Sequence, residues 1–154
     1  MTALTEGMKA PDFELPRDGG ETAKLSQYFG RKLVLYFYPK DDTSGCTKEA
    51  LAFTELKDKF NAAGADILGM SPDSATKHDK FISKHELSVP LASDEDKTTL
   101  EAYGVWVEKS MYGKKYMGVE RSTFLIDEGG KIEKIWRKVK VPGHAEEVLA
   151  TVTG

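Results

Sequence analysis

The chain alternates short apolar runs with longer amphipathic stretches. Two runs, KLVLYFYP (residues 32–39) and ADILGMSP (65–72), are continuously apolar and too short for typical helices. This pattern is typical of strands covered on both faces, and we expect 32–39 to be the central strand. Shorter runs predict three more strands, at SVPLASD (88–94), RSTFLID (121–127) and IEKIWRKV (132–139).

Helical periodicity occupies the intervals between these strands. From position 50 to 63, apolar residues recur at every third or fourth position, and Gly64 follows the last of them. We therefore expect an amphipathic helix of about 17 residues here. Three further helices are predicted at DSATKHDKFISKHEL (73–87), EDKTTLEAYG (95–104) and GHAEEVLATV (143–152).

The order of these elements predicts an α/β fold. Helices would flank a mixed central sheet in a three-layer sandwich, with the antiparallel hairpin of residues 121–139 on one side of the sheet. FELPRDGGETAKL (13–25) predicts a separate N-terminal β-hairpin, because its Asp-Gly-Gly turn tolerates positive φ. No repeat or long linker interrupts the sequence, so we expect one domain over residues 1–154.

Composition argues against several classes of partner. The 25 acidic and 22 basic residues are scattered, with a formal net charge of −3, so we expect no nucleic-acid or membrane partner. Residues 1–16 lack a basic segment followed by an apolar one, and no run approaches the roughly 18 apolar residues that span a bilayer. We expect an unprocessed cytoplasmic protein.

The chain contains one cysteine, Cys46, within PKDDTSGCTK at the start of the first predicted helix. A lone cysteine cannot form an internal disulfide, which fits a reducing compartment. It shares a helix face with Ala50 and Phe53, so one interpretation is an inert core thiol. The five residues before it are polar or glycine, however, and functional residues concentrate at such boundaries. These cues favour a reactive thiol.

A reactive thiol needs local chemistry that stabilises its thiolate, because a free cysteine is mostly protonated at neutral pH. The helix N-terminus supplies unpaired N–H groups and partial positive charge. Gly45 would let the backbone approach a small substrate, and the Thr43 hydroxyl would donate to or accept from a bound oxygen. Asp41 and Asp42 oppose a thiolate unless they point outward or are neutralised. Arg121 is the candidate cation.

The segment YPKDDTSGCTKEA resembles the active-site segment of the peroxiredoxins, whose pattern Pro-x-x-x-Thr-x-x-Cys matches Pro39, Thr43 and Cys46. The resemblance extends over nearly the whole chain, through APDFELP, YGVW, MYGKKYMGVERSTFLID and VKVPGHAEEVL. The chain is most similar to the bacterioferritin comigratory protein subfamily, also called peroxiredoxin Q.

This resemblance implies a thioredoxin-like fold and a thiol-dependent peroxidase that needs no cofactor. The Cys46 thiolate would attack hydrogen peroxide or a small organic hydroperoxide and become a sulfenic acid. Thr43 and Arg121 would orient the peroxide and stabilise the thiolate, and Pro39 would shield the pocket from water. Together with the backbone at Gly45, Thr43 and Arg121 would form the substrate site.

Two positions depart from the subfamily pattern. Many members carry a resolving cysteine five residues after the first, where this chain has Leu51, and Ser44 replaces the usual proline. Because the chain has no second cysteine, we expect one-cysteine behaviour. An external thiol, whether thioredoxin, glutaredoxin or a low-molecular-weight thiol, would reduce the sulfenic acid through a mixed disulfide. Subfamily members are commonly monomers, so we expect a monomer.

Two other functions share parts of this pattern. A redox sensor with little turnover would carry every motif, and only turnover with a physiological reductant separates it from an enzyme. A thioredoxin-like disulfide oxidoreductase is disfavoured, because such proteins normally use Cys-x-x-Cys and this chain has Cys46-Thr-Lys-Glu49. The preferred hydroperoxide and the reductant stay open.

The remaining candidate features have structural interpretations. EKSMYGKKYMG (108–118) mixes lysines with tyrosines and methionines, which would also suit a nucleic-acid surface. The family resemblance implies instead a loop leading to Arg121, and we favour a structural role because Met and Tyr more often pack than bind. Trp106 and Trp136 are expected in core or edge packing. The three histidines form no recognisable metal motif and are expected at the surface, at positions 78, 85 and 144.

Overall fold

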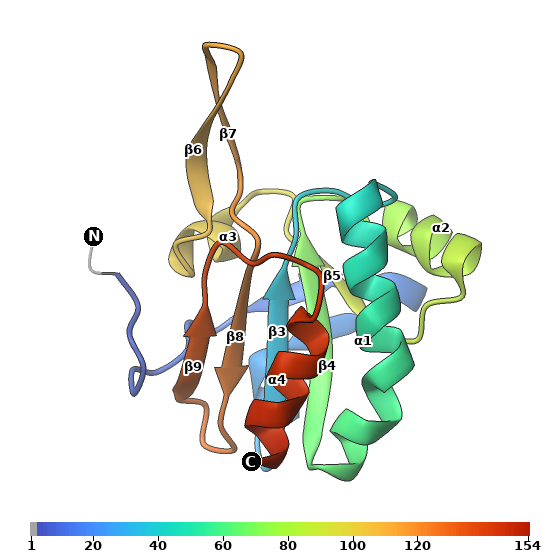
Figure 1. Cartoon of the computed structure of the whole chain (residues 1–154), viewed down its shortest axis with the longest axis vertical. Coiled ribbons are helices and arrows are strands. Elements are labelled where there is room, and N and C mark those ends of the chain that lie inside the picture. Colours follow the sequence, from blue (N-terminus) through green and yellow to red (C-terminus); the bar gives the residue numbers. More distant parts are fainter. Residues whose placement is uncertain (1–2) are drawn as a thin grey trace.

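The computed structural model describes residues 3–154 (Figure 1). The first two residues of the opening segment, in which we expected no targeting signal, lie outside the described residues. A five-stranded mixed sheet has the order β5-β4-β3-β8-β9, so β3 is central, as predicted. Its strands are β3 (Lys32–Phe37), β4 (Ala65–Ser71), β5 (Leu91–Ser93), β8 (Ser122–Ile126) and β9 (Ile132–Trp136).

Strands β3, β4 and β5 run parallel to one another, and β8 and β9 run antiparallel to their neighbours. The helices are α1 (Ser44–Ala62), α2 (Ala75–His85), α3 (Thr98–Ala102) and α4 (His144–Thr153). In Figure 1, α1 and α4 lie side by side in front of the sheet. The predicted α/β sandwich with a mixed sheet is therefore confirmed.

Core packing covers both faces of the sheet. Alternate residues of β3, Leu33, Leu35 and Phe37, enter one hydrophobic cluster together with Leu100 of α3. The intervening side chains, which include Val34 and Tyr36, enter a second cluster, whose other members include Cys46, Phe53, Phe81 and Val148 from α1, α2 and α4. Alternation of this kind is expected of a strand buried on both faces. The single thiol, Cys46, therefore belongs to the cluster between α1 and the sheet.

The predicted N-terminal β-hairpin is also present. Strands β1 (Glu14–Pro16) and β2 (Thr22–Lys24) pair antiparallel across a short 3₁₀ turn, η1 (Asp18–Gly20), and a second 3₁₀ turn, η2 (Leu25–Tyr28), follows. Gly19 and Gly20 both have positive φ, which glycine adopts without steric cost. The backbone N–H of Leu91 donates to the Asp18 carboxylate at 2.9 Å, so the turn is attached to β5.

Residues 106–119 form a hairpin rather than the packed loop we expected. Strands β6 (Trp106–Met111) and β7 (Lys114–Val119) pair antiparallel, and among the described strands they pair only with each other. Tyr112 and Gly113 both have positive φ, which suits the tight turns that match strand twist. The hairpin projects from the end of the molecule where β3 ends and α1 begins (Figure 1).

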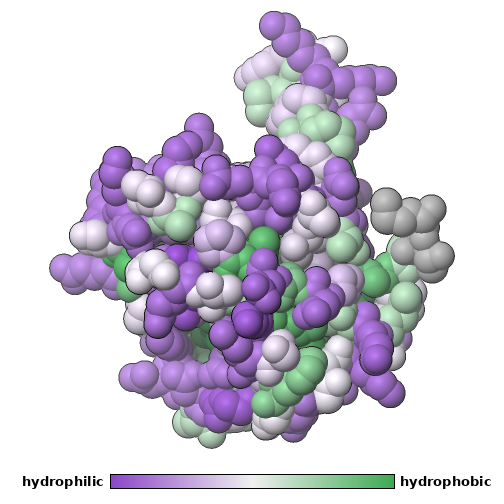
Figure 2. All heavy atoms as spheres, turned by 180° about the vertical axis from the view of Figure 1, so that it is seen from behind, coloured by the Kyte–Doolittle hydropathy of each residue, from purple (hydrophilic) through white to green (hydrophobic). Residues whose placement is uncertain are grey.

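The outer part of this hairpin is exposed. Its large exposed side chains are Met111, Tyr112, Tyr116 and Met117. Figure 2, which views the molecule from behind, shows hydrophobic and hydrophilic residues interspersed along the arm. The tyrosines and methionines here therefore do not pack into the body of the protein, contrary to the interpretation from composition.

The expectation of surface histidines is wrong for two of the three. His78 is 0% exposed and His144 is 6% exposed. The core supplies polar partners that offset the cost of burying each ring: His78 lies between Asp41 and the carbonyl of Ala92, and His144 Nε2 lies 2.8 Å from Thr123 Oγ1.

Trp106 and Trp136 pack, half-buried, against the first and second clusters respectively, so their predicted packing roles are confirmed. Within residues 3–154, no helix is both long and apolar enough to cross a membrane.

Candidate active site

Cys46 is the third residue of α1, and its side chain is only 2% exposed. The helix begins at Ser44 after the N-cap residue Thr43, whose carbonyl accepts the N–H of Thr47 at 2.8 Å. The N–H groups of the first turn have no partner within the helix and carry its positive dipole end. The sulfur is therefore recessed in the core but lies at the electropositive end of α1, as the sequence predicted.

Arg121 reaches this sulfur from a distant part of the chain. Its Nη2 donates to Cys46 Sγ at 3.4 Å. Strand β8 begins at Ser122, which is paired in register with Phe37 at the end of β3. This register places Arg121 beside the loop that leads from β3 into α1. The structure thus brings together the predicted thiol and the predicted cation.

Glu49 is a site residue that the sequence analysis missed. It lies one turn after Cys46 in α1, is 1% exposed, and accepts a hydrogen bond from Arg121 Nη1 at 2.6 Å. Burial raises the pKa of Glu49 to about 7, although the charge and hydrogen bond of Arg121 oppose that rise. Its second oxygen, Oε2, has no hydrogen-bond partner in the described part of the chain. The available signal was an acidic residue on the buried face of an amphipathic helix.

The guanidinium stays charged between these two groups. Burial alone would lower the pKa of Arg121, but the charges of Glu49 and Cys46 outweigh burial and raise that pKa. A cation therefore persists beside the sulfur over the whole physiological pH range.

Gly45 makes room for this guanidinium. A Cβ built on Gly45 would lie 3.2 Å from Arg121 Nη2, closer than ordinary van der Waals contact. Part of the space that we assigned to substrate is therefore filled by Arg121. A side chain at position 45 would push the guanidinium away from Cys46.

The predicted residues Thr43 and Pro39 both lie in the loop between β3 and α1. The exposed Thr43 donates its hydroxyl hydrogen to the carbonyl of Lys40 at 2.8 Å. Because that hydrogen is already engaged, the Thr43 oxygen remains available as an acceptor for a peroxide O–H. Pro39 is half-buried at the start of the loop.

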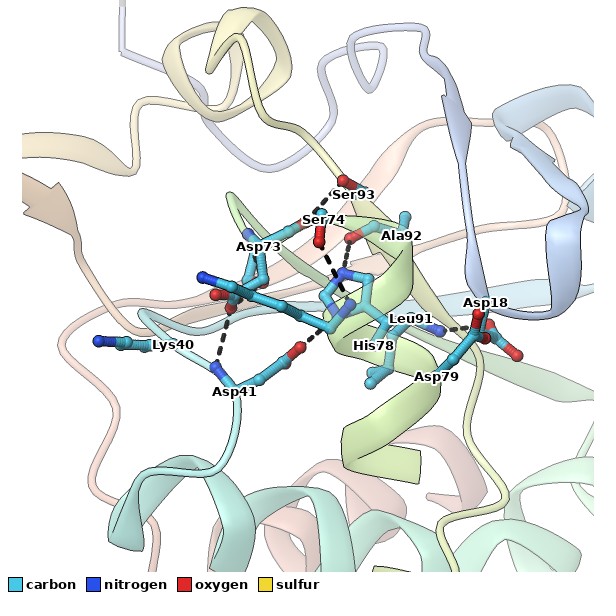
Figure 3. Close-up of polar contacts among 12 residues, drawn as sticks. Asp18, Lys40, Asp41, Asp73, Ser74, His78, Asp79, Leu91, Ala92 and Ser93 are labelled. Atoms are coloured by element: carbon cyan, nitrogen blue, oxygen red, sulfur yellow. Dashed lines mark hydrogen bonds and ion pairs between the residues drawn. The ribbon is translucent and has the colours of Figure 1, made fainter. Parts of the chain in front are cut away.

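Asp41 is held by a buried polar network (Figure 3). Its Oδ2 lies 2.7 Å from Nδ1 of His78, and the hydroxyl of Tyr38 donates to its Oδ1 at 2.6 Å. On the other side of the ring, Nε2 lies 2.8 Å from the carbonyl oxygen of Ala92. Both ring nitrogens therefore face oxygen atoms, and the ring links the loop to β5.

A further contact attaches the same loop to β4. The N–H of Asp41 donates to Asp73 Oδ2 at 2.8 Å, and Asp73 also accepts the hydroxyl of Ser71 at the end of β4.

The next residue of the loop, Asp42, is attached to α2. Asp42 lies within 2.8 Å of both Lys84 and His85. Hydrogen bonds from His85, and then from Lys84, lower the pKa of Asp42. Asp42 thus has a cationic partner in Lys84, and Asp41 is held by hydrogen bonds within the network rather than directed at the thiol.

Comparison with known proteins gives consistent results. Residues 7–135 match the model of the AhpC/TSA family. The chain is 53% identical over 146 residues to peroxiredoxin Bcp of Bacillus subtilis, which covers 95% of this chain and 93% of that protein. A structure of Xanthomonas campestris peroxiredoxin Q has a TM-score of 0.87 at 48% identity, with 91% of this chain and 89% of that chain covered.

A second structure, of the Xanthomonas campestris bacterioferritin comigratory protein, is 45% identical with a TM-score of 0.90, and covers 96% of this chain and 97% of its own. Its description concerns alkyl peroxide reduction. These matches span α1 and Arg121, and the single cysteine fits a one-cysteine member. The chain therefore belongs to the AhpC/TSA family and is a thiol-dependent peroxidase of the peroxiredoxin Bcp, or peroxiredoxin Q, type.

Proposed function

We propose that Cys46 is the peroxidatic residue and that the protein reduces hydrogen peroxide and small organic hydroperoxides. The observation that carries this proposal is the 3.4 Å contact between Arg121 Nη2 and Cys46 Sγ at the start of α1. The alkyl peroxide reduction described for the Xanthomonas campestris relative supports the choice of substrate.

In the first step, the Cys46 thiolate attacks one peroxide oxygen in line with the O–O bond. An S–O bond forms, the O–O bond breaks, and the leaving hydroxide or alkoxide takes a proton to become water or an alcohol. Donors beside the sulfur stabilise the charge that develops on the peroxide oxygens, and Arg121 Nη2 is in that position. The Thr43 oxygen accepts the O–H of the bound peroxide, and Pro39 limits access of water.

Glu49 acts through Arg121 rather than on substrate. Its bond to Nη1 fixes the guanidinium, so that Nη2 points at the sulfur. It is a positioning residue of this site.

An external thiol completes the cycle, because the chain has no second cysteine. The thiol condenses with the Cys46 sulfenic acid to give a mixed disulfide and water, and a second thiol then releases the Cys46 thiolate. Leu51, at the usual resolving position, is 41% exposed, about 140° around α1 from Cys46. A protein thiol, as in thioredoxin or glutaredoxin, reaches the buried sulfur only if the loop between β3 and α1 or the start of α1 opens. A low-molecular-weight thiol needs a smaller opening.

The cellular setting completes the proposal. The protein works as a monomer in a reducing cytoplasm, as the lone cysteine and the scattered charges support. Sedimentation of the reduced and the oxidised protein tests the monomer, since a Cys46-linked dimer would double the mass only after oxidation.

Single-turnover oxidation tests the function. One equivalent of hydrogen peroxide should add one oxygen to Cys46 within seconds, measured by intact mass, and a suitable thiol should remove it through a detectable mixed disulfide. Cys46→Ser should fold but show no turnover. Retained peroxidase activity in that variant would refute the mechanism. Rapid oxidation without turnover by any of the three reductant classes would instead favour a redox sensor.

A further inference from the structure

A cavity of about 540 Å³ lies beside the thiol site, and nothing in the peroxidase mechanism above uses it. The foot of the β6–β7 hairpin, the residues that precede β8, and the segment after β9 line it. Arg121 is one of its lining residues, and the same guanidinium contacts Cys46. The backbone N–H of Val139 donates to the carbonyl of Arg121 at 2.9 Å, which holds the segment after β9 against this site.

Lys109 lines this cavity, and the stem of its side chain lies against a glycine of the paired strand. A Cβ built on Gly118 of the paired strand would lie 3.2 Å from Lys109 Cδ and 3.5 Å from Cε. The missing side chain at position 118 therefore lets the lysine stem lie across β7. Burial lowers the pKa of Lys109, and the charge of Arg121 lowers it further, while Cys46 and Glu120 act in the opposite direction. The ammonium thus lies within electrostatic range of the thiol site.

The unpaired charges that line the cavity are both positive, since Arg121 is paired with Glu49 outside it. Lys109, Lys138 and Arg121 face two carboxylates, Glu108 and Glu120. Each carboxylate has a cationic partner outside the cavity: Glu108 lies 4.0 Å from Lys115, and Glu120 lies 3.7 Å from Arg137. Neither lining lysine has an ion-pair partner among residues 3–154. Two unpaired ammonium groups beside a guanidinium favour an anion between them.

We propose that this cavity is a carboxylate-binding subsite, in which Lys109 and Lys138 hold the carboxylate of an organic hydroperoxide whose peroxide group reacts at Cys46. Val107 and Val139 would contact the carbon chain that joins the two groups. The inference rests on the peroxidase function proposed above and specifies its substrate class.

A carboxylate-bearing thiol has the same anionic chemistry, but the geometry favours the hydroperoxide. The cavity is present in the same conformation as the Arg121–Cys46 contact, with the loop between β3 and α1 folded over the thiol. This is the arrangement that reacts with peroxide. Cys46 is 2% exposed in that arrangement, so a reducing thiol acts after the loop has opened. The preformed subsite therefore serves the oxidation step.

A matched pair of substrates tests the proposal. 4-Hydroperoxy-4-methylpentanoate and its methyl ester carry the same tertiary hydroperoxide and differ in charge. The rate constant for single-turnover oxidation of Cys46 at pH 7 should be about five- to tenfold larger for the acid, and the preference should shrink at high salt. The acid-to-ester ratio removes any general effect of a substitution on thiol reactivity.

Substitutions then locate the preference. In Lys109→Met/Lys138→Met, the acid-to-ester ratio should fall to about one. Gly118→Ala should also lower the ratio, because the added methyl group displaces the Lys109 stem. Lys114→Met, on the hairpin but outside the lining of the cavity, should leave the ratio unchanged and controls for the loss of one positive charge from the hairpin.

Three outcomes would overturn the subsite. Equal rates for acid and ester in the unchanged protein would do so, as would a ratio that survives the double substitution. A carboxylate preference confined to the reduction step, measured with 3-mercaptopropionate against its methyl ester, would reassign the cavity to the reductant. If hydrogen peroxide itself failed to oxidise Cys46, the peroxidase function would fall, whereas normal oxidation without carboxylate preference would remove only the subsite.

Discussion

At the scale of single residues, one guanidinium connects a buried carboxylate with a buried thiol. Arg121 donates to Glu49 through Nη1 and to Cys46 through Nη2. The sequence identified the thiol and the guanidinium, because a cysteine at a helix start needs a cation. It did not identify Glu49, because an acidic residue within a helix is ordinary unless its burial is known.

Replacing Arg121 with alanine should slow peroxide attack. The substitution removes a donor and a positive charge at the sulfur, so we expect a loss of about 10²- to 10³-fold in the second-order rate constant with hydrogen peroxide. Alkylation of Cys46 by iodoacetamide at pH 7 should slow as well. Arg31→Ala, which removes an exposed guanidinium paired with Asp66, is the control and should leave both rates unchanged. An unaltered peroxide rate in Arg121→Ala would contradict the proposed role.

Glu49 should make stability depend on pH. Its carboxyl has a pKa of about 7 in the folded protein against a reference value of 4.5. Between these values the folded state keeps a proton that the unfolded chain has lost, so the free energy of unfolding falls as pH rises. Relative to Glu49→Gln, which cannot titrate, the protein should lose about 3 kcal/mol between pH 4.5 and pH 7. Urea unfolding at several pH values measures this difference, and parallel pH curves would contradict it.

At the scale of elements, the loop from β3 to α1 is positioned by its neighbours rather than by its own sequence. The β3–β8 register brings Arg121 to the end of the loop, and His78 of α2 holds Asp41 within it. Local periodicity predicted these strands and helices. It missed the β6–β7 hairpin, because an arm without a buried face shows little apolar alternation.

Removing His78 should loosen this loop. His78→Gln takes a close hydrogen-bonding partner from Asp41, whose side chain is only 6% exposed, so we expect a loss of about 1–3 kcal/mol in the free energy of unfolding. Amide exchange at residues 41–43 should become faster.

His85→Gln is the matched control for this substitution. It removes one of the two partners of the exposed Asp42, and such surface pairs contribute about 0–1 kcal/mol. Equal losses in the two variants would show that burial of the Asp41–His78 pair does not matter.

At the scale of the whole molecule, one sheet separates two hydrophobic clusters, and the thiol belongs to the cluster under α1 and α4. That residues 1–154 form a single domain stays a prediction. Trp106 packs against one cluster and Trp136 against the other, so the chain carries a natural reporter on each face.

Unfolding should therefore be a single cooperative transition. In Trp106→Phe only Trp136 remains, and in Trp136→Phe only Trp106 remains. In each variant, the fluorescence midpoint in urea should coincide with the midpoint from far-ultraviolet circular dichroism. A fluorescence midpoint displaced from the circular dichroism midpoint would show that the two clusters unfold separately.

The sequence by itself determined the succession of sheet-forming strands and main helices along the chain, the N-terminal hairpin, and Cys46 with its candidate cation, Arg121. These features depend on periodicity, turn residues and motif spacing, which are properties of short segments. Tertiary structure decided which polar groups meet: Glu49 with Arg121, Asp41 with His78, and the lysines that line the cavity beside the thiol. Such pairings follow from strand register and burial, which join residues far apart along the chain.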